Sequence, residues 1–96
     1  MTKAEIVKEI ADKTGIDKRD VLVVIESLMD TVKTTMTQGE EVYLRGFGSF
    51  IIKHRAEKTA RNISKNVTVR VPAHNIPAFR PAKEFIKLLE GTATKE

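Results

Sequence analysis

The stretch Arg45–Pro81 reads RGFGSFIIKHRAEKTARNISKNVTVRVPAHNIPAFRP, and it decides the fold. Its middle predicts a long two-stranded ribbon, with an outgoing strand over Ile51–Arg61, a turn over Asn62–Asn66 and a returning strand over Val67–Ala73. Valine occupies every second position at the start of the returning strand, which is the period of a β-strand. Strands of about nine residues, at roughly 3.3 Å per residue, predict an arm on the order of 30 Å long.

Positive charge is concentrated on this ribbon. Glu57 is the single acid between residues 53 and 70, and the six basic residues there are Lys53, Arg55, Lys58, Arg61, Lys65 and Arg70. Charge is also unevenly distributed over the whole chain. Residues 1–41 hold six basic and nine acidic side chains, whereas residues 42–96 hold eleven basic and four acidic side chains. Lysines on a hairpin can simply protect a sheet edge from pairing. The density of charge here favours contact with nucleic acid or another polyanion.

The length of 96 residues predicts a single small domain spanning residues 1–96. A chain this short, with many residues in a projecting ribbon, leaves few for a core, so we expect a homodimer that shares its core. Cysteine is absent, which suits a reducing compartment, and the start of the sequence lacks the apolar run of a signal peptide. No stretch is apolar enough to span a membrane, and no basic amphipathic helix favours a membrane surface. We therefore expect a soluble cytoplasmic protein.

Two helices are expected before the ribbon. The first begins with a capping box, in which Thr2 is followed three residues later by Glu5, and it ends at Thr14-Gly15. Asp17 is expected to cap a second, longer helix that ends at Gly39.

The remaining elements frame the ribbon. We expect a strand over residues 41–44, then a tight turn over residues 45–48 that places Phe47 and Phe50 in the core. After the ribbon, residues 75–77 are expected to bend, and Pro81 to be the first residue of a last helix that runs over 82–90 and closes at Gly91. Residues 91–96 are expected to be a frayed tail. The predicted fold class is α+β: two N-terminal helices, a three-stranded antiparallel sheet with a long arm over about residues 52–73, and a short C-terminal helix.

Enzymatic chemistry finds little support in the sequence. His54 and His74 have no carboxylate or cysteine at ligand spacing, so we interpret them as exposed histidines in a basic region. The serines stand in no triad-like context. We expect no enzyme, no metal, no cofactor and no small-molecule substrate.

The segments RGFGSF, RAEKTARN and NIPAFRPAKEF resemble those of the HU and integration host factor family of bacterial DNA-bending proteins. The resemblance covers residues 1–90, including the order of the elements. It implies an intertwined dimer whose two arms bind the minor groove of double-stranded DNA and bend or compact it in the nucleoid. It also implies recognition mainly by shape and charge, since the minor-groove code is degenerate.

The resemblance also implies which residues touch DNA. On the arm they are Lys53, Arg55, Lys58, Arg61, Asn62, Ile63, Lys65 and Arg70, and on the body they are Lys3, Arg45, Arg80 and Lys83. Ile63 stands where the family usually has the proline that enters a base step, and Asn66 replaces a turn glycine. Isoleucine is also able to unstack bases, and nicked, gapped or bent DNA would be the favoured form.

Several alternatives stay open at this point. Residues 45–48 match the first positions of the aromatic strand of an RNA-recognition domain, although Ser49 stands where that motif requires an aromatic and the chain opens with two helices. The ribbon could instead dock an acidic protein. Sequence specificity, and the choice between a homodimer and a heterodimer, are also left open.

Overall fold

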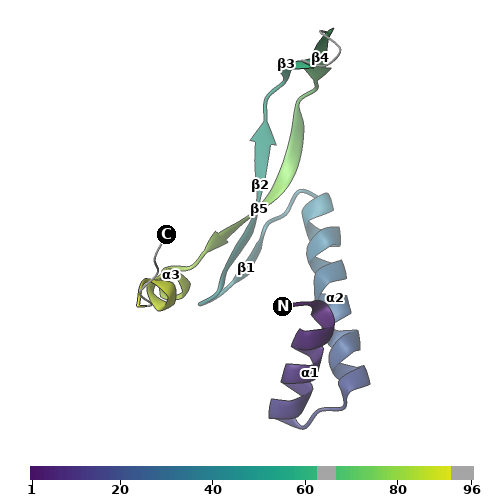
Figure 1. Ribbon diagram of the computed structural model, residues 1–96, viewed down its shortest axis with the longest axis vertical. Coiled ribbons are helices and arrows are strands. Elements are labelled where there is room, and N and C mark those ends of the chain that lie inside the picture. Colours follow the sequence, from purple (N-terminus) through teal and green to yellow (C-terminus); the bar gives the residue numbers. More distant parts are fainter. Residues whose placement is uncertain (63–66, 92–96) are drawn as a thin grey trace.

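The computed structural model describes residues 1–62 and 67–91. Figure 1 shows a helical hairpin at one end, a central sheet, a long arm and a small C-terminal helix. The elements are α1 (Lys3–Thr14), α2 (Lys18–Thr37), β1 (Val42–Leu44), β2 (Gly48–Arg55), β3 (Lys58–Asn62), β4 (Val67–Val71), β5 (His74–Pro81) and α3 (Lys83–Glu90). The predicted α+β fold class is confirmed.

The helical hairpin forms for the expected reasons. Thr2 and Glu5 make the capping box, in which the Glu5 backbone N–H donates to Thr2 Oγ1 at 3.3 Å and the Thr2 N–H donates to Glu5 Oε1 at 2.7 Å. Gly15 ends α1 with a φ of 78°, in the left-handed region. The side chain of Asp17 accepts the Arg19 N–H at 2.8 Å and so caps α2.

The arm consists of two short ladders where the sequence predicted one ribbon. β1, β2 and β5 form an antiparallel sheet in the order β1-β2-β5, and β3 pairs with β4 in a second, two-stranded sheet. Two residues on each side separate the Arg55–His74 pair of the first ladder from the Lys58–Val71 pair of the second, so the register is continuous across the interruption. Pro72 stands at this interruption and has no N–H to donate. The last predicted strand residue, Ala73, lies there too.

Two expectations at the C-terminal end are wrong. Residues 75–77 do not bend, because they lie inside β5, where Ile52 and Pro77 are partners. Ile52 donates its N–H to Glu41 on the β1 side at 3.1 Å, so its backbone polar groups face away from β5. The Pro77 nitrogen consequently points to the open edge, where a missing donor costs no ladder bond. Pro81 ends β5, and the cap of α3 is Ala82, so the helix begins at Lys83.

The turn after β1 brings the phenylalanines together. The Phe47 and Phe79 ring centroids are 5.1 Å apart, those of Phe50 and Phe79 5.2 Å, and those of Phe47 and Phe85 5.4 Å. These contacts attach α3 to the sheet. Gly48 lies under the cluster, where a Cβ would come within 2.5 Å of the Phe79 ring. A glycine is therefore required there by close approach.

A single chain encloses very little core. Among the described residues, the buried apolar side chains are Val7, Val21 and Ile51. Phe47 remains 46% exposed and Phe79 39% exposed, so the core position expected for Phe47 is not reached within one chain. The accessible surface is 8303 Å², against about 5500 Å² for a compact monomer of this mass. The radius of gyration of 19.0 Å likewise exceeds the roughly 12–13 Å of a compact domain of this length.

Candidate nucleic-acid interface

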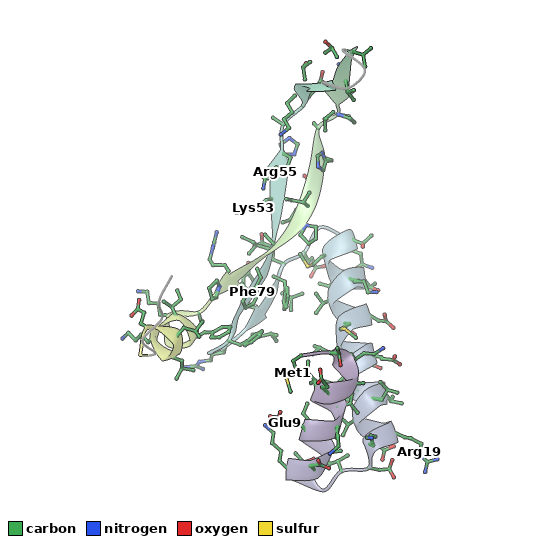
Figure 2. All side chains as sticks on the ribbon, viewed as in Figure 1. Met1, Glu9, Arg19, Lys53, Arg55 and Phe79 are labelled. Carbon is green, nitrogen blue, oxygen red and sulfur yellow. The ribbon has the colours of Figure 1, made fainter. Side chains whose placement is uncertain are left out.

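The central sheet has two chemically different faces. Partners in an antiparallel pair share a face, and successive residues alternate between faces. One face therefore carries Phe50, Ile52 and Phe79, and it adjoins a hollow that Val32 and Met36 of α2 also line. The opposite face carries Lys53 and Arg55 of β2 and Arg80 of β5 and is called the basic face below. Ile51, which is buried, and Ile76 lie on this face as well, between the cations. Figure 2 shows Lys53 and Arg55 on β2, between the body and the distal strands.

The basic face continues onto the body. Arg45, in the turn between β1 and β2, lines one shallow hollow together with Arg80 and Lys83. Lys83 is the first residue of α3, and the Ala82 cap provides no side-chain hydrogen bond to the helix. The N-terminal dipole of α3 thus adds to the positive charge of the hollow. These three residues of the predicted set are brought together by the fold.

An acidic residue is held at the edge of this surface. Glu41 accepts the Ile52 N–H at 3.1 Å and the Tyr43 hydroxyl at 2.9 Å. The Ile52 bond, followed by the Tyr43 bond, lowers the pKa of the Glu41 carboxyl below its ordinary value. The same contact raises the pKa of the Tyr43 phenol. Glu41 therefore fastens the start of β1 to β2.

The distal arm holds the remaining predicted contacts. Lys58 is the first residue of β3, and Arg61 and Asn62 belong to the same strand. Arg70 on β4 forms an ion pair with Glu57, the single acid of the ribbon, so a phosphate would have to compete with that carboxylate. Ile63 and Lys65 lie outside the described residues, as does Asn66. The predicted turn began at Asn62, and this boundary is wrong, because Asn62 pairs with Val67 in the β3–β4 ladder.

Lys3 stands apart from the other predicted residues. Its Nζ lies 2.8 Å from Glu26 Oε2, which joins the first turn of α1 to α2. Both side chains are about half exposed. Lys3 also lines a hollow between the two helices, separate from the hollow of Arg45. Within one chain, therefore, Lys3 is an ion-paired residue of the helical hairpin.

Most of the predicted cations have no acidic partner. Among the side chains that the structure describes, those of residues 1–59 and 67–91, ion pairs involve two members of the predicted set, Lys3 and Arg70. Those without an ion pair in this part of the chain are Arg45, Lys53, Arg55, Lys58, Arg80 and Lys83. All six residues are exposed. The charge of Arg80 also acts on the nearby Glu41 carboxylate. Together the six cations give the face and the arm a positive potential suited to a phosphate backbone.

Sequence reasoning missed two features of this surface. It interpreted His74 as an ordinary exposed histidine, whereas the register places it opposite Arg55, on the basic face. It also named Arg70 as a DNA contact without foreseeing the ion pair with Glu57. The signal for both was the pairing register, which the continuous Val67–Val71 pattern alone did not reveal.

Other kinds of site find no support in the described residues. No cluster of three histidine, cysteine or acidic side chains suited to a metal ion occurs in residues 1–62 or 67–91. None of the helices in that same part of the chain is both long and apolar enough to cross a membrane.

Comparisons with known proteins agree with this surface. The model of the family described as "Bacterial DNA-binding protein" matches residues 1–90. Integration host factor subunit beta of Marinobacter nauticus is 39% identical, over 99% of this chain and 98% of that protein. DNA-binding protein HRL53 of Rhizobium leguminosarum is 37% identical, over 95% of this chain and all of that one. The structure also resembles that of Anabaena HU in a cocrystal with DNA. The two chains superpose with a TM-score of 0.90 and are 30% identical, over 96% of this chain and all of the Anabaena chain.

Proposed function

This chain belongs to the bacterial DNA-binding protein family of HU and integration host factor, and from that premise we propose that it bends duplex DNA with its arm in the minor groove. The observation that carries the proposal is a set of exposed cations that make no ion pair: Lys53, Arg55 and Arg80 on the basic face, and Lys58 on the distal arm. The Anabaena relative was crystallised with DNA, which supports the same partner for this chain. We further propose association with the nucleoid in the cytoplasm.

The chemistry of the surface favours recognition by shape and charge. Lysine and arginine bind phosphates of any sequence and enter narrow minor grooves readily. The minor groove itself distinguishes little more than A·T from G·C pairs. We therefore propose low sequence specificity, with bending supported by base-step insertion from the segment that includes Ile63.

A second copy of the chain is the proposed cover for the apolar face. Phe79, Phe85 and Ile86 line an apolar hollow beside α3, and Leu28 of α2 is 46% exposed. Apolar surface of this extent is not left to water in a stable small domain. A homodimer would bury it and would also place two arms on one body. A heterodimer with a related chain is the alternative outcome of the test below.

RNA binding is the weaker candidate. An RNA-recognition sheet stacks bases on exposed aromatic rings. Here the phenylalanines of β2 and β5 lie on the apolar face, and Ser49 of β2 pairs with Tyr43 and Arg80. Tyr43 is the one aromatic residue that the described sheet places on the basic face.

The decisive experiment measures affinity and bending together. A duplex of about 35 base pairs carries a donor and an acceptor dye at its ends and is titrated with protein at several salt concentrations, beside a nicked duplex and an RNA duplex. We expect energy transfer to rise on binding, tighter binding to nicked DNA, and a steep loss of affinity with salt. Binding without a change in energy transfer would refute bending. Equal affinity for RNA, or capture of acidic proteins in place of DNA, would refute the assigned partner.

A further inference from the structure

We propose that His74 is a further DNA-contacting residue, which binds a phosphate oxygen through Nε2 only when the imidazole is protonated. DNA binding by this chain would then take up a proton. The inference rests on the proposed function and deepens it, because it adds a contact that changes with pH to the contacts of the permanently charged side chains.

The position of His74 follows from the strand register. It is the first residue of β5, and its partner on β2 is Arg55. Directly opposite residues in an antiparallel pair have Cβ atoms about 4.5–5.5 Å apart and share a face. Lys53, two residues before Arg55, lies on that face as well. His74 is exposed, so a phosphate held by Arg55 is within reach of its ring.

The hydrogen bond made by the ring determines what Nε2 can do. His74 Nδ1 lies 2.9 Å from the backbone oxygen of Pro72. A carbonyl oxygen only accepts, so Nδ1 must carry the hydrogen. In the neutral ring Nε2 is then a bare acceptor, which cannot bond to a phosphate oxygen. A second proton turns Nε2 into a charged donor and leaves the Pro72 bond intact.

The phosphate of bound DNA is the charge that favours this proton. On β2 the facing groups are Arg55 and Lys53, and beyond the interruption of the arm they are Glu57 and Arg70, which neutralise each other. Arg55 and Lys53 carry the same charge as a protonated ring and oppose it, but they also attract the phosphate, and the phosphate favours a positive ring. Histidine is the side chain that ordinarily changes charge between about pH 5 and 8, so the test is made in that range.

His54 provides a matched control in the same part of the arm. It pairs with Asn75, so it lies on the apolar side of the sheet, opposite to the basic face. Its Nδ1 lies 3.0 Å from Asn75 Oδ1, which orients its ring much as Pro72 orients that of His74. The two histidines thus share chemistry, exposure and distance from the body, and they differ in the face that they occupy.

The test measures the affinity for one intact duplex between about pH 6 and pH 8 at constant ionic strength. We expect the affinity of the wild type to fall as the pH rises, by less than about tenfold for each His74 in the complex if DNA favours the charged ring by about tenfold. His74→Gln should flatten this dependence, and His74→Lys should bind tightly and without pH dependence. His54→Gln should keep the wild-type profile. Calorimetry in buffers of different ionisation enthalpy counts the protons taken up.

Each outcome decides the proposal. A wild type that binds DNA equally well across the range, or a His74→Gln variant that keeps the wild-type slope, would overturn the role of His74. Loss of the slope in His54→Gln alone would overturn the assignment to the basic face. None of these results touches the proposed function, which would instead fail if the wild type bound no DNA at any pH.

Discussion

Replacing Phe79 by alanine tests whether a second chain completes the core. In one chain the Phe79 ring contacts the rings of Phe47 and Phe50 but remains 39% exposed. If the ring stayed in that state, truncation would remove roughly three fifths of a side-chain burial, or about 1–2 kcal/mol. If a partner encloses the ring, truncation should cost about 3–5 kcal/mol per chain, and twice that in a homodimer.

The assay is urea unfolding of wild type and variant at several protein concentrations, beside sedimentation of the folded protein. A dimer that unfolds to monomers gains stability with concentration, so its midpoint should rise as the protein is concentrated. Tyr43→Ala is the control, because Tyr43 is 68% exposed on the basic face, and losing its bond to Glu41 should cost about 1 kcal/mol. A concentration-independent midpoint, with a cost for Phe79→Ala no larger than that for Tyr43→Ala, would refute the shared core.

Three further predictions concern the arm and the sheet. The double variant Lys53→Ala, Arg55→Ala removes up to four phosphate contacts from a homodimer, so the slope of log K against log salt should become shallower by about 3–4; an unchanged slope would contradict the basic face. The charge-matched control replaces two ion-paired lysines of the helices, Lys8 and Lys33. Gly48→Ala should lower the free energy of unfolding by about 1–3 kcal/mol, measured in urea, because the added Cβ would lie 2.5 Å from the Phe79 ring and 2.7 Å from the Arg80 carbonyl oxygen. A variant as stable as the wild type would show that the sheet can shift to make room for the methyl group. Ile63→Ala should weaken binding and energy transfer on intact duplex while sparing nicked DNA, in which unstacking is already done; equal losses on both would make Ile63 a turn residue only.

Local chemistry made the helices predictable from the sequence. The capping box of Thr2 and Glu5 and the Asp17 cap depend on residues within one turn of each other, so their meaning does not change with the rest of the fold. Gly39 ends α2 as predicted, because it takes the left-handed conformation directly after the Gln38 cap.

Proline was misread where tertiary context decides its role. Pro77 suggested a bend, yet it is accommodated because β5 is an edge strand whose outward nitrogens need no partner. Pro81 suggested the start of a helix, yet it still pairs with Gly48. The neighbouring residues in the sequence do not reveal that β5 is an edge strand, nor whether a given backbone nitrogen points toward β2 or toward the open edge. The Glu57–Arg70 ion pair was missed for the same reason, since it depends on strand register.

The two prolines of β5 also bear on how copies of the chain avoid pairing through their sheet edges. Pro77 faces its nitrogen to the open side of the sheet, and Pro81, four residues later, repeats that orientation by the two-residue period of a strand. A strand that paired with this edge of β5 would lack two hydrogen bonds, because Pro77 and Pro81 have no N–H to donate. Open sheet edges otherwise act as templates on which chains stack into insoluble fibres. β5 therefore offers other chains an incomplete edge, on which such stacking is disfavoured.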